Sequence, residues 1–201
     1  MILEAILLGI LLGKLRGGGF NRLGQSIFKL SWVIFFAFSL TLLTSILISL
    51  GNPIAIKYRM LYYIISYGLL IISLFFNIKY KSMWFIMLGC ISNFIAILIN
   101  GGSMPIDMSI LKKMGFENLF TSIESGALVQ YIPLDKVNNF TVYLGKIFST
   151  PKGYPLKQIF SIGDLLIVIG IFFLIQGMML SNTYGRRSKV IRFDHKGKLI
   201  K

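Results

Sequence analysis

The chain has 201 residues, of which 55% are hydrophobic and 14% are charged, and its formal net charge at pH 7 is +14. A water-soluble domain has about 25% charged residues, so this composition excludes an ordinary soluble protein and indicates a membrane protein. The cations lie between apolar runs and in the C-terminal tail, which is the distribution that orients membrane helices and argues against nucleic-acid binding.

Five apolar runs predict an all-α, polytopic membrane helix bundle, because a helix that crosses a bilayer needs about 20 mostly apolar residues. The predicted spans are 1–15, 30–50, 60–78, 83–99 and 162–180. The first run is short: at ~1.5 Å per residue it reaches only about 22 Å, against a hydrocarbon core of ~30 Å. If it does not span, the other four runs keep the same orientation.

The basic residues predict how the bundle is oriented. They gather after the first run, between the third and fourth runs, and after the fifth, and these three segments share one side of a five-span bundle. The long segment 101–160 lies on the opposite side and nearly balances its lysines with acidic residues. The positive-inside rule therefore places the N-terminus outside and the C-terminus in the cytoplasm. We predict a single membrane-embedded domain, 1–181, followed by a basic cytoplasmic tail, 182–201.

The outer loop 101–160 is predicted to cover the outer ends of the helices. Asp107 is a suitable N-cap for a short helix that Gly115 would end. Apolar residues then recur near helical spacing as far as Ile123, which indicates two short amphipathic helices on the membrane surface. A mobile loop with incidental apolar residues is the alternative.

Small residues on three of the predicted helices indicate close packing between helices. On the fourth run, Asn93 and Asn100 share one helical face with Gly89 and Ala96, so this face is interpreted as a helix–helix contact. Glycines four apart on the first run and seven apart on the fifth lead us to expect that these two helices pack through them. Those glycines are Gly9 and Gly13 on the first run, and Gly163, Gly170 and Gly177 on the fifth.

Asp164 is the leading candidate for an acid or base, because a carboxylate near lipid is costly unless it has a function. Ser161-x-x-Asp164 also fits a capping box that would only stabilise the start of the last helix, and this alternative stays open. Glu4 is a weaker candidate, since it can simply lie at the interface beside the amino terminus. Two carboxylates at one site would be able to share acid–base work.

A polar binding site is predicted where these groups meet at the outer face. Besides Asp164 it would include Asn93, Ser161 and the loop that follows the fourth run, whose glycines can expose backbone amides. That loop is Asn100, Gly101, Gly102, Ser103, Met104 and Pro105.

The basic tail is a candidate for binding anionic lipid headgroups, although a signal for topology alone would have the same composition. Its candidate residues are Arg186, Arg187, Lys189 and Arg192. Neither a metal site nor a cofactor is expected. Cys90 is the single cysteine, which excludes an intramolecular disulfide and a cysteine-based zinc site, and His195 is the single histidine. The glycines at 17–19 lack the strand and the Gly-Lys-Ser/Thr sequence of a P-loop.

The sequence resembles a family of small bacterial membrane proteins filed as domain of unknown function 5317. The similarity rests on residues 7–18 (LLGILLGKLRGG), 100–105 (NGGSMP), 154–156 (YPL) and 160–164 (FSIGD). One departure is Lys146, which follows Gly145 where the family pattern leads us to expect an aspartate. The resemblance implies residence in a bacterial cytoplasmic membrane and brings no activity with it.

Residues 160–164 are also similar to the element that opens the last helix of the lipoprotein signal peptidases, which are aspartic enzymes. Their mechanism activates water with two coupled carboxylates. In this chain Ala96 stands where that family's second aspartate is expected, so the similarity does not carry the activity over.

These observations favour a non-enzymatic membrane protein that binds a lipid or another membrane protein. A membrane-embedded enzyme with a polar site around Asp164 at the outer face is the alternative. A transporter component is a third hypothesis, although the middles of the runs are mostly Leu, Ile and Phe, whereas transporters place polar or broken helices near the midplane.

Overall fold

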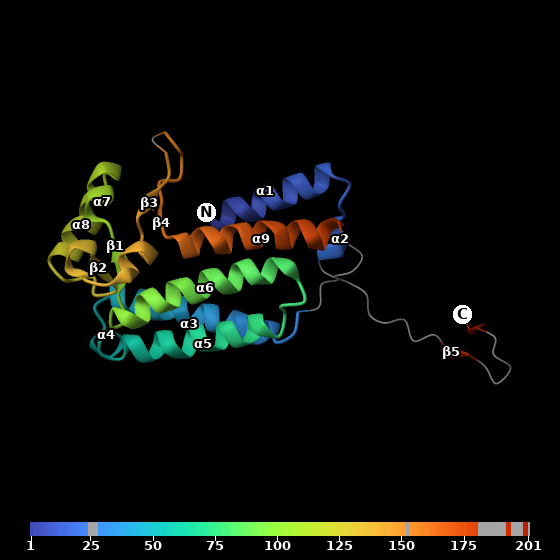
Figure 1. Ribbon diagram of the computed structural model, residues 1–201, viewed down its shortest axis with the longest axis horizontal. Coiled ribbons are helices and arrows are strands. Elements are labelled where there is room, and N and C mark those ends of the chain that lie inside the picture. Colours follow the sequence, from blue (N-terminus) through green and yellow to red (C-terminus); the bar gives the residue numbers. More distant parts are fainter. Residues whose placement is uncertain (24–27, 152, 181–191, 194–198, 201) are drawn as a thin grey trace.

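The structure is a computed structural model that describes residues 1–23, 28–151, 153–180, 192–193 and 199–200. Five long helices run side by side along the molecule, and a smaller folded segment lies at one end of them (Figure 1). The long helices are α1 (Ile2–Leu15), α3 (Ser31–Ser49), α5 (Arg59–Phe75), α6 (Lys81–Ile99) and α9 (Ile162–Leu180). Two short helices, α2 (Phe20–Leu23) and α4 (Pro53–Lys57), lie in the connections, and the tail contains a two-stranded pairing of β5 (Arg192–Phe193) with β6 (Leu199–Ile200).

Each of the five predicted apolar ranges coincides with one long helix to within three residues at either end. Three of them, α3, α6 and α9, have 19 residues each and are long and apolar enough to cross a membrane. The helix α5 is apolar but has 17 residues, and α1 has 14. Many of their large apolar side chains are exposed, for example Leu7 on α1 and Phe35 on α3. Such surfaces suit lipid rather than water, so the fold is compatible with a membrane protein.

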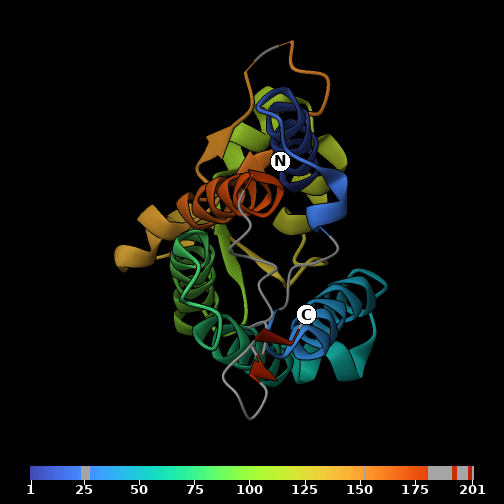
Figure 2. The ribbon, with the colours of Figure 1, turned by 90° about the vertical axis from the view of Figure 1, so that its right-hand side faces the viewer.

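The long helices form a row rather than a closed bundle. The main helix contacts are those of α1 with α9, α9 with α6, α6 with α5, and α5 with α3. The order in space is therefore α1, α9, α6, α5, α3, which can be followed in Figure 2, where the row is seen end on. The helices at the two ends of the row, α1 and α3, each have one principal neighbour.

Residues 101–160 fold into a compact unit, which we call the cap. It contains β1 (Met104–Ile106) paired in parallel with β2 (Tyr131–Pro133), and β3 (Phe148–Ser149) paired antiparallel with β4 (Ile159–Phe160). Between these strands lie α7 (Met108–Met114), α8 (Glu117–Glu124) and two 3-10 helices, η1 (Leu134–Lys136) and η2 (Phe140–Leu144).

The two short helices predicted in the loop are present, and their boundaries have the predicted chemistry. The Asp107 side chain accepts hydrogen bonds from Ser109 N and Ile110 N, and Gly115 ends α7 with a left-handed φ of 77°. Their apolar residues do not need a membrane surface to be buried. Leu111 and Ile123 pack with Ile106 in a core that belongs to the cap itself, which explains their helical spacing and excludes a loop without internal structure.

The glycine contacts differ in one respect from the expectation. Gly9 and Gly13 of α1 do face α9, where a Cβ on Gly9 would lie 3.1 Å from Ile175 Cβ. Gly163 and Gly170 of α9 face α6 instead of α1, so the expectation that these two glycines pack against α1 was wrong. The reason is that α9 lies between α1 and α6 and presents large side chains to one and small ones to the other.

The contact between α6 and α9 is consequently the tightest of the row. A Cβ on Gly89 would lie 2.7 Å from Ile167 Cγ1 and closer still to the carbonyl oxygen of Gly163, and a Cβ on Gly170 would lie 2.5 Å from Ile86 Cγ1. Backbone can approach backbone here only because these positions have no side chain.

We expect Gly89→Ala to lower the free energy of unfolding by about 1–3 kcal/mol, because the added methyl group overlaps backbone that cannot move away freely. The matched control is Gly68→Ala on α5, where nothing lies within 4 Å of the added Cβ. This control should be neutral or stabilising, since alanine favours a helix over glycine. Thermal unfolding of the detergent-solubilised proteins measures both, and equal melting temperatures for the two variants would contradict the proposed tight contact.

Candidate functional site

Asp164 lies in the first turn of α9 and forms the predicted capping box with Ser161. The backbone N–H of Asp164 donates to Ser161 Oγ at 3.0 Å, and the backbone N–H of Ser161 donates to Asp164 Oδ2 at 3.1 Å. Each of these two backbone N–H groups thus has a side-chain acceptor, which is the arrangement that stabilises a helix N-terminus. The capping interpretation therefore holds, but it uses only part of the hydrogen-bonding capacity of the carboxylate.

Asn93 of α6 connects the capping box to the neighbouring helix. Its side chain donates from Nδ2 to Asp164 Oδ1 at 2.8 Å and accepts at Oδ1 from Ser161 Oγ, which is 2.7 Å away. The two contacts together fix which end of the amide is oxygen. Close approach at Gly163 makes them reachable, because a Cβ on Gly163 would lie 2.7 Å from Asn93 Cγ.

Lys146 of the cap completes the network. Its Nζ lies 3.1 Å from Asp164 Oδ2, and the relative exposures of the two side chains are 23% and 29%. The backbone of Lys146 is held against β1, since its N–H donates to the carbonyl of Pro105 at 2.8 Å and its carbonyl accepts from the N–H of Asp107. The ion pair thus joins the cap to the helix row at one defined point.

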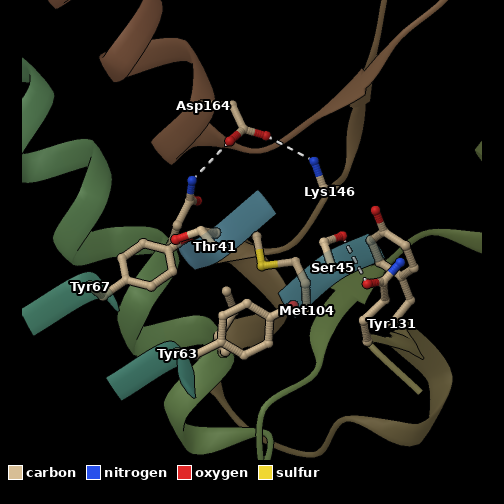
Figure 3. A pocket seen from close by; sticks show the side chains of 11 residues that line it. Thr41, Ser45, Tyr63, Tyr67, Met104, Tyr131, Lys146 and Asp164 are labelled. Atoms are coloured by element: carbon tan, nitrogen blue, oxygen red, sulfur yellow. Dashed lines mark hydrogen bonds and ion pairs between the residues drawn. The ribbon is translucent and has the colours of Figure 1, made fainter. Parts of the chain in front are cut away.

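A cavity of about 150 Å³ lies beside this ion pair, between the helices and the cap. Figure 3 shows Asp164 and Lys146 on one side of it and Tyr63 on the opposite side. Every long helix of the row except α1 contributes to the walls. The lining residues are Thr41 and Ser45 of α3, Tyr63 and Tyr67 of α5, Asn93 and Ile97 of α6, Asp164 of α9, and Met104, Gln130, Tyr131 and Lys146 of the cap.

Of the predicted loop after α6, only Met104 lines this cavity together with Asp164. Asn100 donates to the carbonyl of Ala96 and to Thr141 Oγ1, at 2.7 Å each, and Ser103 donates to the carbonyl of Val129. Those two side chains therefore hold the loop and the cap together.

The glycines of this loop do not offer free amides. The N–H of Gly101 donates to the carbonyl of Leu98 and that of Gly102 to Ile97, so both close the end of α6. Their φ angles are 62° and 88°, a region that favours glycine. The geometry of this turn is explained by the termination of α6, and the carbonyl of Pro105 accepts a hydrogen bond from the backbone N–H of Lys146.

Glu4 lies in a different cavity from the one described above. It pairs with the amino group of Met1 and accepts a hydrogen bond from Gln158 Nε2 at 3.0 Å. It also accepts from Tyr154, and this hydrogen bond raises the pKa of the tyrosine. Each carboxylate thus has its own partners, and the shared acid–base site that we considered for Glu4 and Asp164 is not formed by direct contact.

The candidate residues of the tail lie largely outside this description. Arg186, Arg187 and Lys189 fall outside the described residues, and Arg192 is described only as backbone of β5. Within the part of the chain that the structure describes, no three His, Cys, Asp or Glu side chains gather into a possible metal site.

Sequence reasoning missed most of the cavity wall. Two pairs had a usable signal, because Thr41 with Ser45 and Tyr63 with Tyr67 are four apart on apolar helices and must share a face. Lys146 had no such signal, since its position depends on how the cap folds over the helices.

We expect Asp164→Asn and Lys146→Met each to lower the free energy of unfolding by about 1–2 kcal/mol, since either leaves a partly buried charge without its partner. The double variant should lose less than the sum, with a coupling energy of about 1 kcal/mol. Lys113→Met is the control, because Lys113 is an exposed cation of α7. Denaturant unfolding in detergent measures the wild type, the three single variants and the double variants of Asp164→Asn with Lys146→Met and with Lys113→Met. Coupling between Asp164→Asn and Lys113→Met as large as that with Lys146→Met would contradict a specific ion pair.

Comparison with known proteins gives one match. The model of DUF5317, described as a family of unknown function, matches residues 25–176. No curated protein and no solved structure matches the chain. The matched range includes the cap and the residues of the Asp164 network, and it covers well over half of the chain. The protein therefore belongs to DUF5317, a family of unknown function.

Proposed function

We propose that the protein is a multi-pass membrane protein of the bacterial cytoplasmic membrane, with five spans, the cap outside and the C-terminal tail in the cytoplasm. The cap lies at one end of the long helices, whereas Lys29 and Lys79 belong to the connections at the opposite end and Lys81 begins α6 there (Figure 1). That separation is the charge asymmetry expected of an oriented bundle. Residues 1–181 would form the membrane domain, and the tail 182–201 would lie against anionic lipids.

The contact of α1 with α9 makes it easier for the short helix α1 to cross the bilayer. Its glycines let it lie directly against α9, so one of its sides is covered by protein and only the rest must meet lipid. A span shorter than the hydrocarbon core is tolerated by local thinning of the bilayer, at a modest free-energy cost.

Within this topology we propose that the cavity beside Asp164 binds a small polar ligand at the outer membrane face, such as a lipid headgroup. The observation that carries the proposal is the convergence of polar side chains from α3, α5, α6, α9 and the cap on one cavity. Placing polar groups at membrane depth is costly. The hydrogen bonds of the Asp164 network form without using this cavity, so the polar groups around it are explained by a ligand that occupies it.

The size and charge of the cavity limit the ligand. A cavity of ~150 Å³ takes a molecule of about the size of benzene, so a headgroup or small solute fits and a peptide does not. Lys146 and Asp164 present both signs of charge to the same space, which favours a neutral or zwitterionic group with donors and acceptors.

The topology is tested by labelling single cysteines in intact cells, with Cys90 replaced by Ala. We expect a membrane-impermeant maleimide to label Ser109→Cys, which is exposed on the cap, and not Lys79→Cys, which is exposed at the opposite end. Permeabilised cells should show labelling of both. Labelling of Lys79→Cys alone in intact cells would reverse the orientation.

Ligand binding is tested by native mass spectrometry of protein extracted gently from its own membrane. We expect a retained mass in the wild type that is lost in Thr41→Phe, because the larger side chain fills the cavity. Leu43→Phe is the control, since Leu43 is an exposed apolar residue of the same helix outside the cavity. Retention of the same mass by Thr41→Phe would exclude this cavity as its site.

An enzyme that uses Asp164 as acid or base is the second candidate, favoured by one observation. Asp164 and Met104 line the same cavity, so the carboxylate faces a space that a substrate can occupy. The carboxylate also accepts three hydrogen bonds, from Asn93, Lys146 and Ser161, which suits a structural role. Loss of cellular function in Asp164→Asn, with native folding and unchanged ligand retention, would favour the enzyme.

A further inference from the structure

An apolar groove lies on the far side of the Asp164 network from the polar cavity. Its volume is about 540 Å³, and it runs between α1, α9 and the hairpin of β3 with β4. The walls are mostly apolar, with Leu8, Val168, Ile169, Phe172 and Phe173 among them, and they also include Glu4. From Val168 to Phe173 the groove follows α9 for about 8 Å at ~1.5 Å per residue, so it extends from the cap to the middle of the helix.

The groove continues toward the cap through a second cavity of about 290 Å³. The two cavities share Phe160 and Val168 as lining residues. The second one also has Lys146, Asp164 and Gln158 in its wall, so a molecule that enters along the groove reaches both partners of the ion pair.

A third cavity, of about 200 Å³, adjoins the second and shares Lys146, Gln158 and Ile159 with it. Lys157 lines this third cavity as well, so two ammonium groups face one space, and no carboxylate is among its lining residues. Lys157 donates to the carbonyl of Met114 at 3.2 Å and takes part in neither ion pair of the described residues. One of the two cations is therefore without a neutralising carboxylate.

We propose that these three adjoining cavities bind one anionic lipid of the bilayer, with an acyl chain in the groove and the charged headgroup between Lys146 and Lys157. The order of surfaces, from apolar at the depth of α9 to cationic under the cap, matches the two parts of such a lipid. A small free anion would not fill the apolar groove. A lipid without net charge would leave the charge of Lys157 without an anionic partner. The inference rests on the proposed membrane placement and is separate from the ligand of the polar cavity.

The test compares two lipids that have the same chains and differ in charge. Native mass spectrometry of the purified full chain measures retention of dioleoyl phosphatidylglycerol and dioleoyl phosphatidylcholine, added at equal concentration. We expect the wild type to retain the anionic lipid about fivefold better, which corresponds to roughly one surface cation's attraction. Lys157→Gln should lose most of that preference and Lys157→Arg should keep it. Lys112→Gln removes an exposed cation of α7 that lines none of these cavities and should have no effect.

The groove is tested with Val168→Trp, which should reduce retention of both lipids, whereas Leu43→Trp on the exposed face of α3 should not. Equal retention of the two lipids by the wild type would overturn the proposal, and so would unchanged retention in Val168→Trp. If Lys157→Gln does not fold, the comparison of the two lipids on the wild type and the comparison of Val168→Trp with the wild type still test the proposal. Thr41→Phe should leave the lipid preference intact, so failure of the polar cavity and failure of this lipid site give different results.

Discussion

The closeness of α6 to α9 is the constraint on which the rest of the structure depends. Without side chains at Gly89 and Gly163, the two backbones approach until Asn93 can bind both Ser161 and Asp164. This approach places the carboxylate of Asp164 at the end of α9 nearest the cap, where Lys146 of the cap forms an ion pair with it. The ion pair, the docking of the cap and the cavity between cap and helices all follow from this one approach.

The network around Asp164 serves stability and leaves room for function. Every polar atom that it uses has a partner, which lowers the cost of burying charge. Yet the pair of Lys146 with Asp164 does not fill the space around it. Polar side chains from four helices and the cap gather around one neighbouring cavity, whereas the other two are lined mainly by apolar residues together with Lys146, Lys157 and Gln158, and one of them also by Asp164. Lys146 thus stands between two chemically different compartments.

The sequence predicted well those features that depend on local pattern. Apolar runs located the long helices, Asp107 and Gly115 located α7, and the spacing of Ser161 and Asp164 predicted their mutual hydrogen bonds. The features that were missed depend on tertiary structure. Which side of α9 its glycines face is decided by the order of helices in the row.

Lys146 illustrates the same limit within the site. Its approach to Asp164 requires that residues 145–146 pair beside β1, and that β1 itself pairs with β2 from a distant part of the cap. No spacing in the sequence encodes those pairings. Gly145 carried a partial signal, since a Cβ there would lie 2.9 Å from the carbonyl oxygen of Pro105, but a lone glycine before a lysine does not reveal its neighbour.

The position of α1 at the end of the row has a consequence for biosynthesis. Its principal neighbour, α9, ends at Leu180, so α1 cannot complete this contact until residues as far as 180 have been made. The contact of α6 with α9 likewise waits until the whole cap has been synthesised. During translation α3, α5 and α6 can already associate as neighbours in both sequence and space, whereas α1 lacks its principal neighbour until α9 has been made. Assembly is therefore expected to proceed from the middle of the chain, and both α1 and the Asp164 network are completed in its final step.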